Sequence, residues 1–328
     1  MIALLLLTGL GWLLSQSLAI GAFALRDIGR RPRAWWITFI SLAILALPVA
    51  FRLLEPDAPF WLIAAVALVL PLPVVKLVDA HVGIDAWRAM TWRQWVLHVA
   101  NIHGLCWRAM LAEPRRPRAQ SLRWLLRGVV EVAAGVLLLT WAVQADLGRF
   151  GFWVEHFIKL TAGYLLAFDG LFALATGANR LAGVNVVDGT RHPILAATPA
   201  DFWRRYNRDP GRFFLEDVYK PAGGRHHPVR GVLVVFAVNG LLHEYLAVIV
   251  TGRLTGYMLA FFALHAAAVA VSAPWKPRGA RRFIGWACTF CLLVVSSPLF
   301  LAPIDLAIPL YDSWSPPAGW RIFPAAGG

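Results

Sequence analysis

The sequence predicts an all-α polytopic membrane protein, because three of its properties fit a bilayer better than water. Of its 328 residues, 59% are hydrophobic and only 15% are charged, whereas soluble domains carry about 25% charged residues. The mean hydropathy is +0.62. Several apolar segments reach the roughly 20 residues that a helix needs to cross the hydrocarbon core. With so few charges, the chain cannot cover a water-exposed surface.

About eight apolar segments have this length, and we expect each to form a transmembrane helix. The first has no positive residues ahead of its apolar run, and the run is too long for a signal peptide, so we expect it to be retained. Pro71 and Pro73 should kink the third. The segments are residues 2–25, 35–54, 60–78, 124–145, 152–178, 231–251, 254–272 and 283–303.

Positive residues alternate along the chain. The net charge is +13, and most of the 31 lysines and arginines lie in the connections after the first, third, fifth and seventh segments. Short basic blocks between apolar segments are typical of membrane topology, so we expect no nucleic-acid partner. The positive-inside rule places these connections in the cytoplasm and both termini outside. Arginine outnumbers lysine, which indicates a GC-rich bacterial gene and therefore the bacterial inner membrane.

The longest basic connections cover residues 79–123 and 179–230. The first interleaves Trp87, Trp92, Trp95 and Trp107 with arginines, which fits short interfacial helices at the headgroups on the cytoplasmic side. No Gly/Ser-rich linker divides the chain, so residues 1–328 are predicted to form a single domain.

Ionisable residues inside the predicted helices need a reason, because a charge at the bilayer centre costs about 2.5–3.5 kcal/mol on insertion scales. Glu131 follows Arg127 by four residues, which predicts an ion pair. Lys159 can extend its amine to the interface. Asp169 either pairs with another helix or lines a wet cavity. For His265 we expect a hydrogen-bonded packing role.

His243 is the strongest candidate for a reactive residue. Asn239 lies four residues earlier on the same helix face, and Glu244 and Tyr245 follow directly. A buried imidazole tends to stay neutral and can then accept a proton. His243 could thus act as general base while an alcohol attacks an activated acyl group. The oxyanion formed needs a donor, which an asparagine amide could supply.

Other chemistries lack their motifs. Ala247 stands where a zinc-protease helix would need its second histidine. No Cys/His set has metal-binding spacing, so no metal is expected. Cys288 and Cys291 lie in an apolar run. Neither a nucleophile elbow nor a phosphate loop is present, which argues against a serine hydrolase or a nucleotide hydrolase.

A dense polar segment precedes this helix, ADFWRRYNRDPGRFF at residues 200–214. Its aromatic residues are typical of membrane interfaces: Phe202, Trp203 and Tyr206. Its arginines could bind phosphates: Arg204, Arg205, Arg208 and Arg212. The same composition also fits an ordinary headgroup anchor.

Three stretches together resemble the membrane-bound O-acyltransferase family: DFWRRYN (201–207), RFFLEDVYKPAGG (212–224) and GLLHEYL (240–246). The first is similar to the tryptophan-rich motif of wax synthases and of sterol and diacylglycerol acyltransferases, which ends in asparagine. The first two are also similar to the alginate-acetylating and teichoic-acid-alanylating branch, which more often has histidine at the position of Asn207. The chain length matches short wax-synthase-like members best.

This resemblance implies roles for particular residues. His243 is expected to be the catalytic base and Asn207 to act near the acyl carbonyl. The mouth for an acyl-CoA or other thioester donor is expected to be framed by Trp203, Arg204, Arg205, Tyr206 and Arg208. Asn239 and Glu244 are expected to contact substrate. The acceptor would be a long-chain alcohol, lipid, glycan or natural product, and acyl-CoA would be a co-substrate, with no bound cofactor.

Two other functions remain open from the sequence. A proton-coupled transporter could use Glu131, Asp169 and His243 as a proton path, although no inverted repeat is visible. A catalytically inactive envelope scaffold would need neither Asn207 nor His243.

Overall fold

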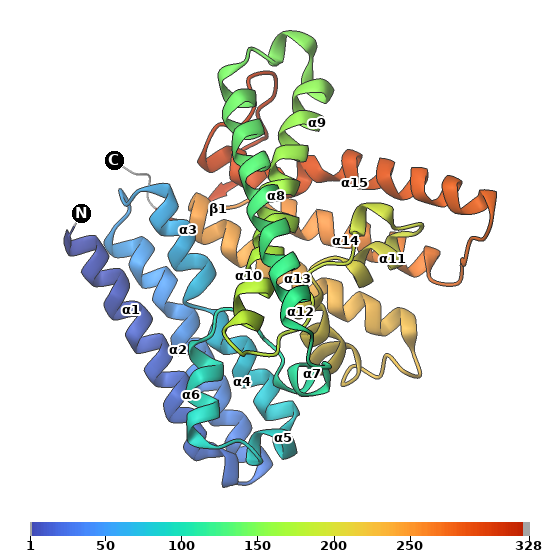
Figure 1. Cartoon of the computed structure of the whole chain (residues 1–328). Coiled ribbons are helices and arrows are strands. Elements are labelled where there is room, and N and C mark those ends of the chain that lie inside the picture. The colour runs from blue at the N-terminus through green and yellow to red at the C-terminus, as the bar shows by residue number, and fades with distance from the viewer. Residues whose placement is uncertain (1, 324–328) are drawn as a thin grey trace. The chain divides into compact units, whose positions relative to one another are not determined.

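The computed structural model describes residues 2–323 and is helical almost throughout (Figure 1). The chain forms two compact units. The first unit contains residues 1–112, 244–255 and 319–328, and the second contains Glu113–His243 and Gly256–Ala318. The predicted all-α membrane architecture is confirmed, while the prediction of a single domain stays a prediction.

Seven helical stretches within residues 2–323 are long and apolar enough to cross a membrane. The eighth predicted helix is present but short: α14 (Tyr257–Ser272) has 16 residues, about 24 Å against a hydrocarbon core of about 30 Å. Gly256, at a φ of 75°, precedes it, and Pro274 follows. The seven stretches are Ile2–Asp27, Arg30–Leu54, Phe60–Val82, Arg118–Gln144, Phe152–Leu181, Pro228–Thr251 and Ala280–Ala307.

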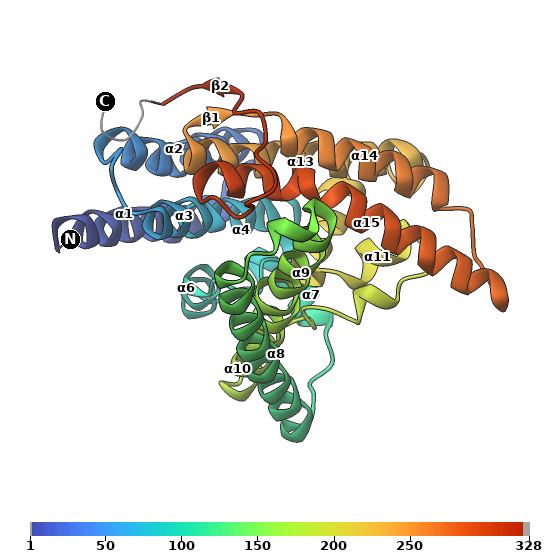
Figure 2. The same ribbon diagram turned by 90° about the horizontal axis from the view of Figure 1, so that it is seen from above.

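In the first unit, α1 (Ile2–Gly21), α2 (Arg30–Leu54), α3 (Phe60–Val69) and α4 (Leu72–Val82) lie side by side (Figures 1 and 2). The predicted proline kink separates α3 from α4. Because Val74 bonds to the Pro71 carbonyl, the Leu70 carbonyl is freed from the helix. It accepts the Ser15 hydroxyl at 2.7 Å, so the kink leaves no unpaired carbonyl there.

The short helices expected within residues 79–123 are α5 (Ile84–Arg88), α6 (Trp92–Ala100) and α7 (Trp107–Ala112). The prediction that these helices lie at the interface is wrong for two of their tryptophans. Trp87 and Trp95 are buried in the core of the first unit, and the Trp95 indole donates to the Ala19 carbonyl at 3.2 Å. Trp92 is half exposed. Strands β1 (Arg253–Leu254) and β2 (Trp320–Arg321) pair antiparallel in this unit.

The second unit is built on a long helical hairpin. Helix α8 (Arg118–Gln144) runs against α9 (Phe152–Gly163), a π-helical segment (Tyr164–Gly170) and α10 (Leu171–Leu181) (Figure 1). Glycines spaced by seven residues let the two backbones approach closely, as is common for membrane helices. A Cβ at each would lie within 3 Å of backbone atoms. They are Gly128, Gly135, Gly170 and Gly177.

Charged residues along this hairpin are paired. Arg127 binds Glu131 at 2.8 Å, as predicted, and also Asp169 at 2.5 Å. Asp169 therefore pairs with another helix, and it accepts the Tyr164 and Thr190 hydroxyls as well. This ties the segment after α10 to the helices.

Lys159 does not extend to an interface as expected. It is buried and pairs with Glu155, one helical turn earlier, at 2.5 Å. Its amine also donates to the Leu310 carbonyl. A lysine with a carboxylate one turn away needs no access to water.

The remaining helices of the second unit pack the polar segment at residues 200–214 against an apolar cluster. They are α11 (Pro199–Arg205), α12 (Arg208–Phe213), α13 (Pro228–Thr251, through His243), α14 and α15 (Ala280–Ala307). Helix α11 packs against α14, which packs against α15 (Figure 1). An apolar cluster around Phe236, Phe261 and Phe262 lies beneath Trp203.

Candidate active site

The segment that carries the predicted site folds as two short helices joined at Asn207. Thr198 begins α11 by accepting the Asp201 amide at 3.1 Å, with Pro199 in the first helical position. Asn207 has a left-handed φ of 39°, which asparagine tolerates better than most residues. The chain can therefore turn sharply between α11 and α12.

Asp188 organises the arginines around this turn. It pairs with Arg180 at 2.8 Å, with Arg191 at 3.3 Å and with Arg208 at 3.4 Å. Burial alone raises the pKa of Asp188, but the charges of Arg180 and then Arg208 outweigh burial and hold this pKa below its usual value. Asp188 thus stays ionised and fixes Arg208 against the body of the second unit.

A pocket of about 670 Å³ opens beside these arginines. Asp201 is its one acidic lining residue, so the lining is strongly positive. The Trp203, Phe214, Leu215, Val235 and Phe236 side chains make the apolar part. Arginine guanidinium groups suit phosphate, which they can bind with two hydrogen bonds. The lining arginines are Arg191, Arg204, Arg205, Arg208 and Arg212.

Tyr219 forms another wall of this pocket. A Cβ at Gly224 or Gly231 would lie within 2.7 Å of the Tyr219 ring. Only glycine leaves room for the ring at these two positions. Packing against the Tyr219 ring thus explains the last glycine of the YKPAGG stretch, Gly224.

Trp203 is the centre of an aromatic cluster. Its indole nitrogen donates to His265 Nδ1 at 3.1 Å, and His265 Nε2 lies 2.9 Å from the Ser296 hydroxyl. Both ring nitrogens of His265 are therefore occupied, which agrees with the predicted packing role. The Phe262 ring contacts Trp203 on one side and His243 on the other, with ring centroids at 5.9 and 4.7 Å.

His243 has one occupied nitrogen and one unoccupied nitrogen. Its Nδ1 lies 2.9 Å from the Asn239 carbonyl oxygen. Because a carbonyl only accepts, Nδ1 carries the proton and Nε2 keeps its lone pair in the neutral ring. Within residues 2–323, no hydrogen bond involves this Nε2. The ring is half-buried between Phe262 and Phe300.

The structure brings some predicted residues together and not others. Five of the predicted site residues line the pocket: Trp203, Arg204, Arg205, Arg208 and Asn239. It includes neither Asn207 nor Tyr206, and it ends one helical turn before His243. Tyr206 stacks on Phe202, with centroids 5.3 Å apart.

Asn207 and Glu244 differ in their partners. The Asn207 side-chain oxygen is buried and makes no hydrogen bond within the described chain. Glu244 is buried in the first unit, where its carboxylate accepts the Thr255 amide at 2.9 Å and the Thr255 hydroxyl at 3.2 Å. Glu244 therefore has a structural use. Its predicted substrate contact and the predicted catalytic role of Asn207 stay predictions.

The sequence did not single out Asp188, Asp201, Arg191 or Tyr219 for this site. Asp201 pairs with Arg205 at 2.9 Å, a contact that their i,i+4 spacing could have predicted. Asp188 lies outside any regular pattern, and only the fold brings it to three arginines.

Comparison with known protein families matches residues 115–301 to the MBOAT, membrane-bound O-acyltransferase family. A comparison with curated proteins gives no match. The matched region covers the hairpin of α8 and α10, the arginine-lined pocket, the whole of α13 and most of α15. Together with the membrane-spanning helices, this match shows that the chain belongs to the membrane-bound O-acyltransferase family and is an integral membrane acyltransferase.

Proposed function

We propose that this acyltransferase moves an acyl group from acyl-CoA to an acceptor hydroxyl, with His243 as general base. The observation that carries the proposal is the unoccupied Nε2 of His243. Two other histidines lie in apolar helices of the second unit, His156 and His265. Both have partners on both ring nitrogens. Of these three, only His243 has a nitrogen available to take a proton from a substrate.

In the proposed step, Nε2 takes the hydroxyl proton as the acceptor oxygen attacks the thioester carbonyl carbon. The carbon–sulfur bond then breaks, and the CoA thiolate leaves with the proton from the imidazolium. The products are an ester and free CoA, and the step uses no metal or bound cofactor. The Asn207 amide is the proposed donor to the transient oxyanion.

The positive pocket supports CoA as the donor. CoA carries several phosphate charges, and five arginines line the pocket against one aspartate. Asn239 also lines the pocket and is the proposed contact for the thioester arm. From there the acyl end must extend about one helical turn, roughly 5.4 Å, to reach His243.

An apolar acceptor fits the surroundings of His243 best. Phe262 and Phe300 flank its ring, so a long-chain alcohol or lipid is favoured over a glycan. Together with asparagine at position 207, this favours the wax-synthase-like branch. We place the protein in a bacterial inner membrane, with the arginine pocket facing cytoplasmic CoA. Both termini lie outside if α14 counts as a crossing.

The test is ester formation by purified protein, followed by mass spectrometry. Acetyl-, octanoyl- and palmitoyl-CoA serve as donors, and hexadecanol, glycerol and glucose as acceptors. We expect protein-dependent ester and free CoA with at least one pair. His243→Ala should lower kcat about 10²- to 10⁴-fold, the usual contribution of a general base.

The control is His226→Ala, which removes an exposed loop histidine and should leave turnover unchanged. Thermal unfolding of both variants checks that they fold. Retained turnover in folded His243→Ala protein would overturn the assignment of the base. Absence of ester from every donor would overturn the choice of acyl-CoA.

A further inference from the structure

The loop between α14 and α15 concentrates positive charge without counter-charge. Lys276 and Arg278 lie in the loop, and Arg281 and Arg282 lie in the first turn of α15. No aspartate or glutamate occurs between Glu244 and Asp305. Within residues 2–323, none of these four cations forms an ion pair. Their charges are thus left for something outside the chain to neutralise.

Positive charges at the start of α15 repel the positive end of the helix dipole unless an anion is bound. A helix N-terminus carries a partial positive charge and favours acidic residues nearby. The first turn of α15 has no acidic residue and instead carries two arginines. Free backbone N–H groups and cationic side chains together favour a bound anion at this position.

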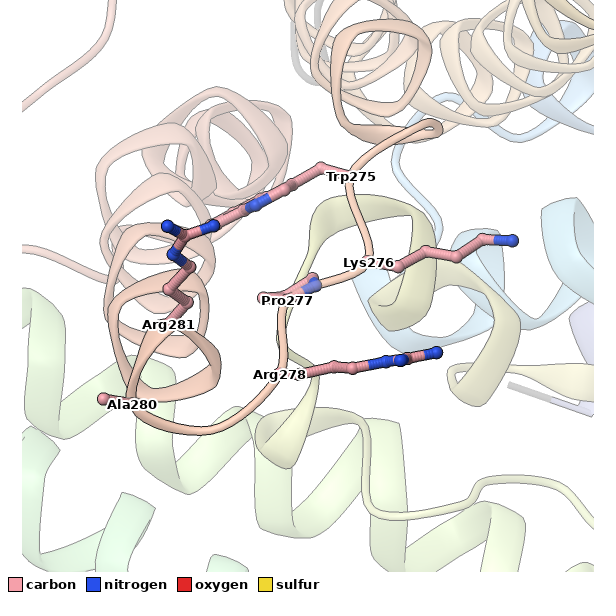
Figure 3. Close-up of a pocket in the computed structure, with 6 residues that line it drawn as sticks. All are labelled: Trp275, Lys276, Pro277, Arg278, Ala280 and Arg281. Atoms are coloured by element: carbon pink, nitrogen blue, oxygen red, sulfur yellow. The ribbon is translucent and has the colours of Figure 1, made fainter.

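The loop also forms a hollow of about 510 Å³. Figure 3 shows the Arg281 guanidinium directed toward the Trp275 side chain, whereas Lys276 and Arg278 project together from the other side of the loop. The lining residues are Trp275, Lys276, Pro277, Arg278, Ala280 and Arg281.

The backbone of this loop is well defined. Gly279 has a φ of 55° and a ψ of −138°, a conformation that is essentially restricted to glycine, and the Pro277 ring fixes its own φ. The Trp275 ring packs so closely on α15 that a Cβ at Gly285 would lie 3.0 Å from it. These residues therefore restrict the backbone that carries the cations.

Apolar side chains border the cationic loop on both helices. Val271 near the end of α14 is 80% exposed, and Phe283 and Ile284 in α15 are 69% and 57% exposed. In a membrane protein such side chains face lipid tails. The hollow next to them thus lies at the level of the headgroups, where Trp275 also fits.

We propose that this cationic loop binds the phosphodiester of an anionic phospholipid, with Lys276 and Arg278, which project from the same side of the loop, as its ligands. Arg281 adds positive charge beside the hollow. The shared chemistry is an oxyanion of phosphorus, and the adjoining lipid-facing residues favour a lipid over a soluble phosphate. This inference goes beyond the proposed acyl transfer and does not depend on it.

The test is native mass spectrometry of the purified full chain, released from detergent with equimolar phosphatidylglycerol and phosphatidylcholine. We expect wild-type protein to retain phosphatidylglycerol preferentially. Each cation removed should weaken this preference roughly fivefold, so K276Q/R278Q/R281Q should abolish it. The matched control, R115Q/R118Q/R123Q, removes the same charge from exposed residues before and within α8 and should keep the preference.

Two further arms separate the alternatives. Sodium pyrophosphate at millimolar concentration should not displace phosphatidylglycerol; displacement would indicate a site for soluble phosphates and overturn the lipid assignment. An equal loss in both triple variants would show a net-charge effect only. If the triple variant fails to fold, R278Q alone should still lose about fivefold, and unchanged retention in R278Q would overturn the proposal.

Discussion

Two polar clusters inside the second unit differ in whether their hydrogen-bonding groups are used up. The first surrounds Glu155 and His156 on α9, where the groups that the described chain places together are paired with one another. The second includes Trp203 and His243, which contact the same Phe262 ring, and Asn207 at the turn after α11. There, His243 Nε2 and the Asn207 side-chain oxygen have no hydrogen-bond partner within residues 2–323. Burial of polar residues is common to both clusters, so only unused groups distinguish a site from a structural tie.

The α9 cluster holds the segment after α15 in place. His156 contacts the Tyr311 and Ser297 hydroxyls, both at 2.8 Å. Glu155 accepts the Asp312 amide at 2.8 Å and the Ser313 amide at 3.2 Å, in addition to its pair with Lys159. Within residues 2–323, the ring nitrogens of His156 and both carboxylate oxygens of Glu155 thus have partners.

The largest expected effect comes from a substitution that disrupts the polar cluster around Glu155 and His156 on α9. Glu155→Gln removes the buried partner of Lys159 and leaves only the exposed Asp312 carboxylate, at 3.6 Å, which should lower the free energy of unfolding by about 3–5 kcal/mol. Thermal unfolding in detergent measures the loss, and turnover per folded molecule should stay unchanged. The double variant Glu155→Gln/Lys159→Met should recover much of the stability. A loss of turnover at unchanged stability would contradict the structural role.

The second effect separates the backbone conformation of Asn207 from the proposed role of its side-chain amide. Asn207→Gly keeps the left-handed backbone and removes the amide, so it should fold normally and lose about 10²- to 10³-fold in kcat, as expected for an oxyanion donor. Asn207→Ala adds backbone strain and should also lower the unfolding temperature. If the glycine variant turns over normally, the residue serves the turn alone.

The third effect concerns the donor pocket. Arg212 lines it and forms no ion pair within the described chain, so Arg212→Gln removes a ligand contact with little structural cost. The KM for acyl-CoA should rise about 10- to 100-fold, as for a lost hydrogen bond to a charged group, with kcat nearly unchanged. Arg225→Gln, outside the lining, is the control. Equal effects of the two variants would argue against phosphate binding in this pocket.

The smallest effect is the pH dependence of Asp188. Because its folded pKa lies below the unfolded value, its stabilising contribution is full above the unfolded pKa of about 3.9 and is lost as pH falls through the folded pKa. Asp188→Asn should therefore be less stable than wild type at pH 7, and the difference should shrink below about pH 4. A difference that stays constant with pH would mean that the charge is not involved.

Hydropathy was sufficient to place the long helices, because a bilayer requires a continuous apolar segment of fixed length. It could not show that Gly256 and Pro274 confine α14 to 16 residues. Nor could composition tell that Trp87 and Trp95 face the protein core, since α5 and α6 carry one arginine each and such a helix can turn either face outward.

The candidate site was predictable only in part. The spacing of Asn239 and His243 places both on one helix face, and the structure adds their hydrogen bond. His156, His243 and His265 look alike in an apolar sequence. Their difference depends on Tyr311, Ser297, Trp203 and Ser296, which the fold alone brings near.

The most direct test of the unoccupied nitrogen is the protonation pattern of His243. Nitrogen-15 NMR of histidine-labelled protein distinguishes a protonated ring nitrogen from one with a lone pair, and the His243 signals are those missing from His243→Gln. We expect a protonated Nδ1 and a lone-pair signal from Nε2 that shifts when hexadecanol is added. A protonated Nε2 in the neutral ring would contradict the account.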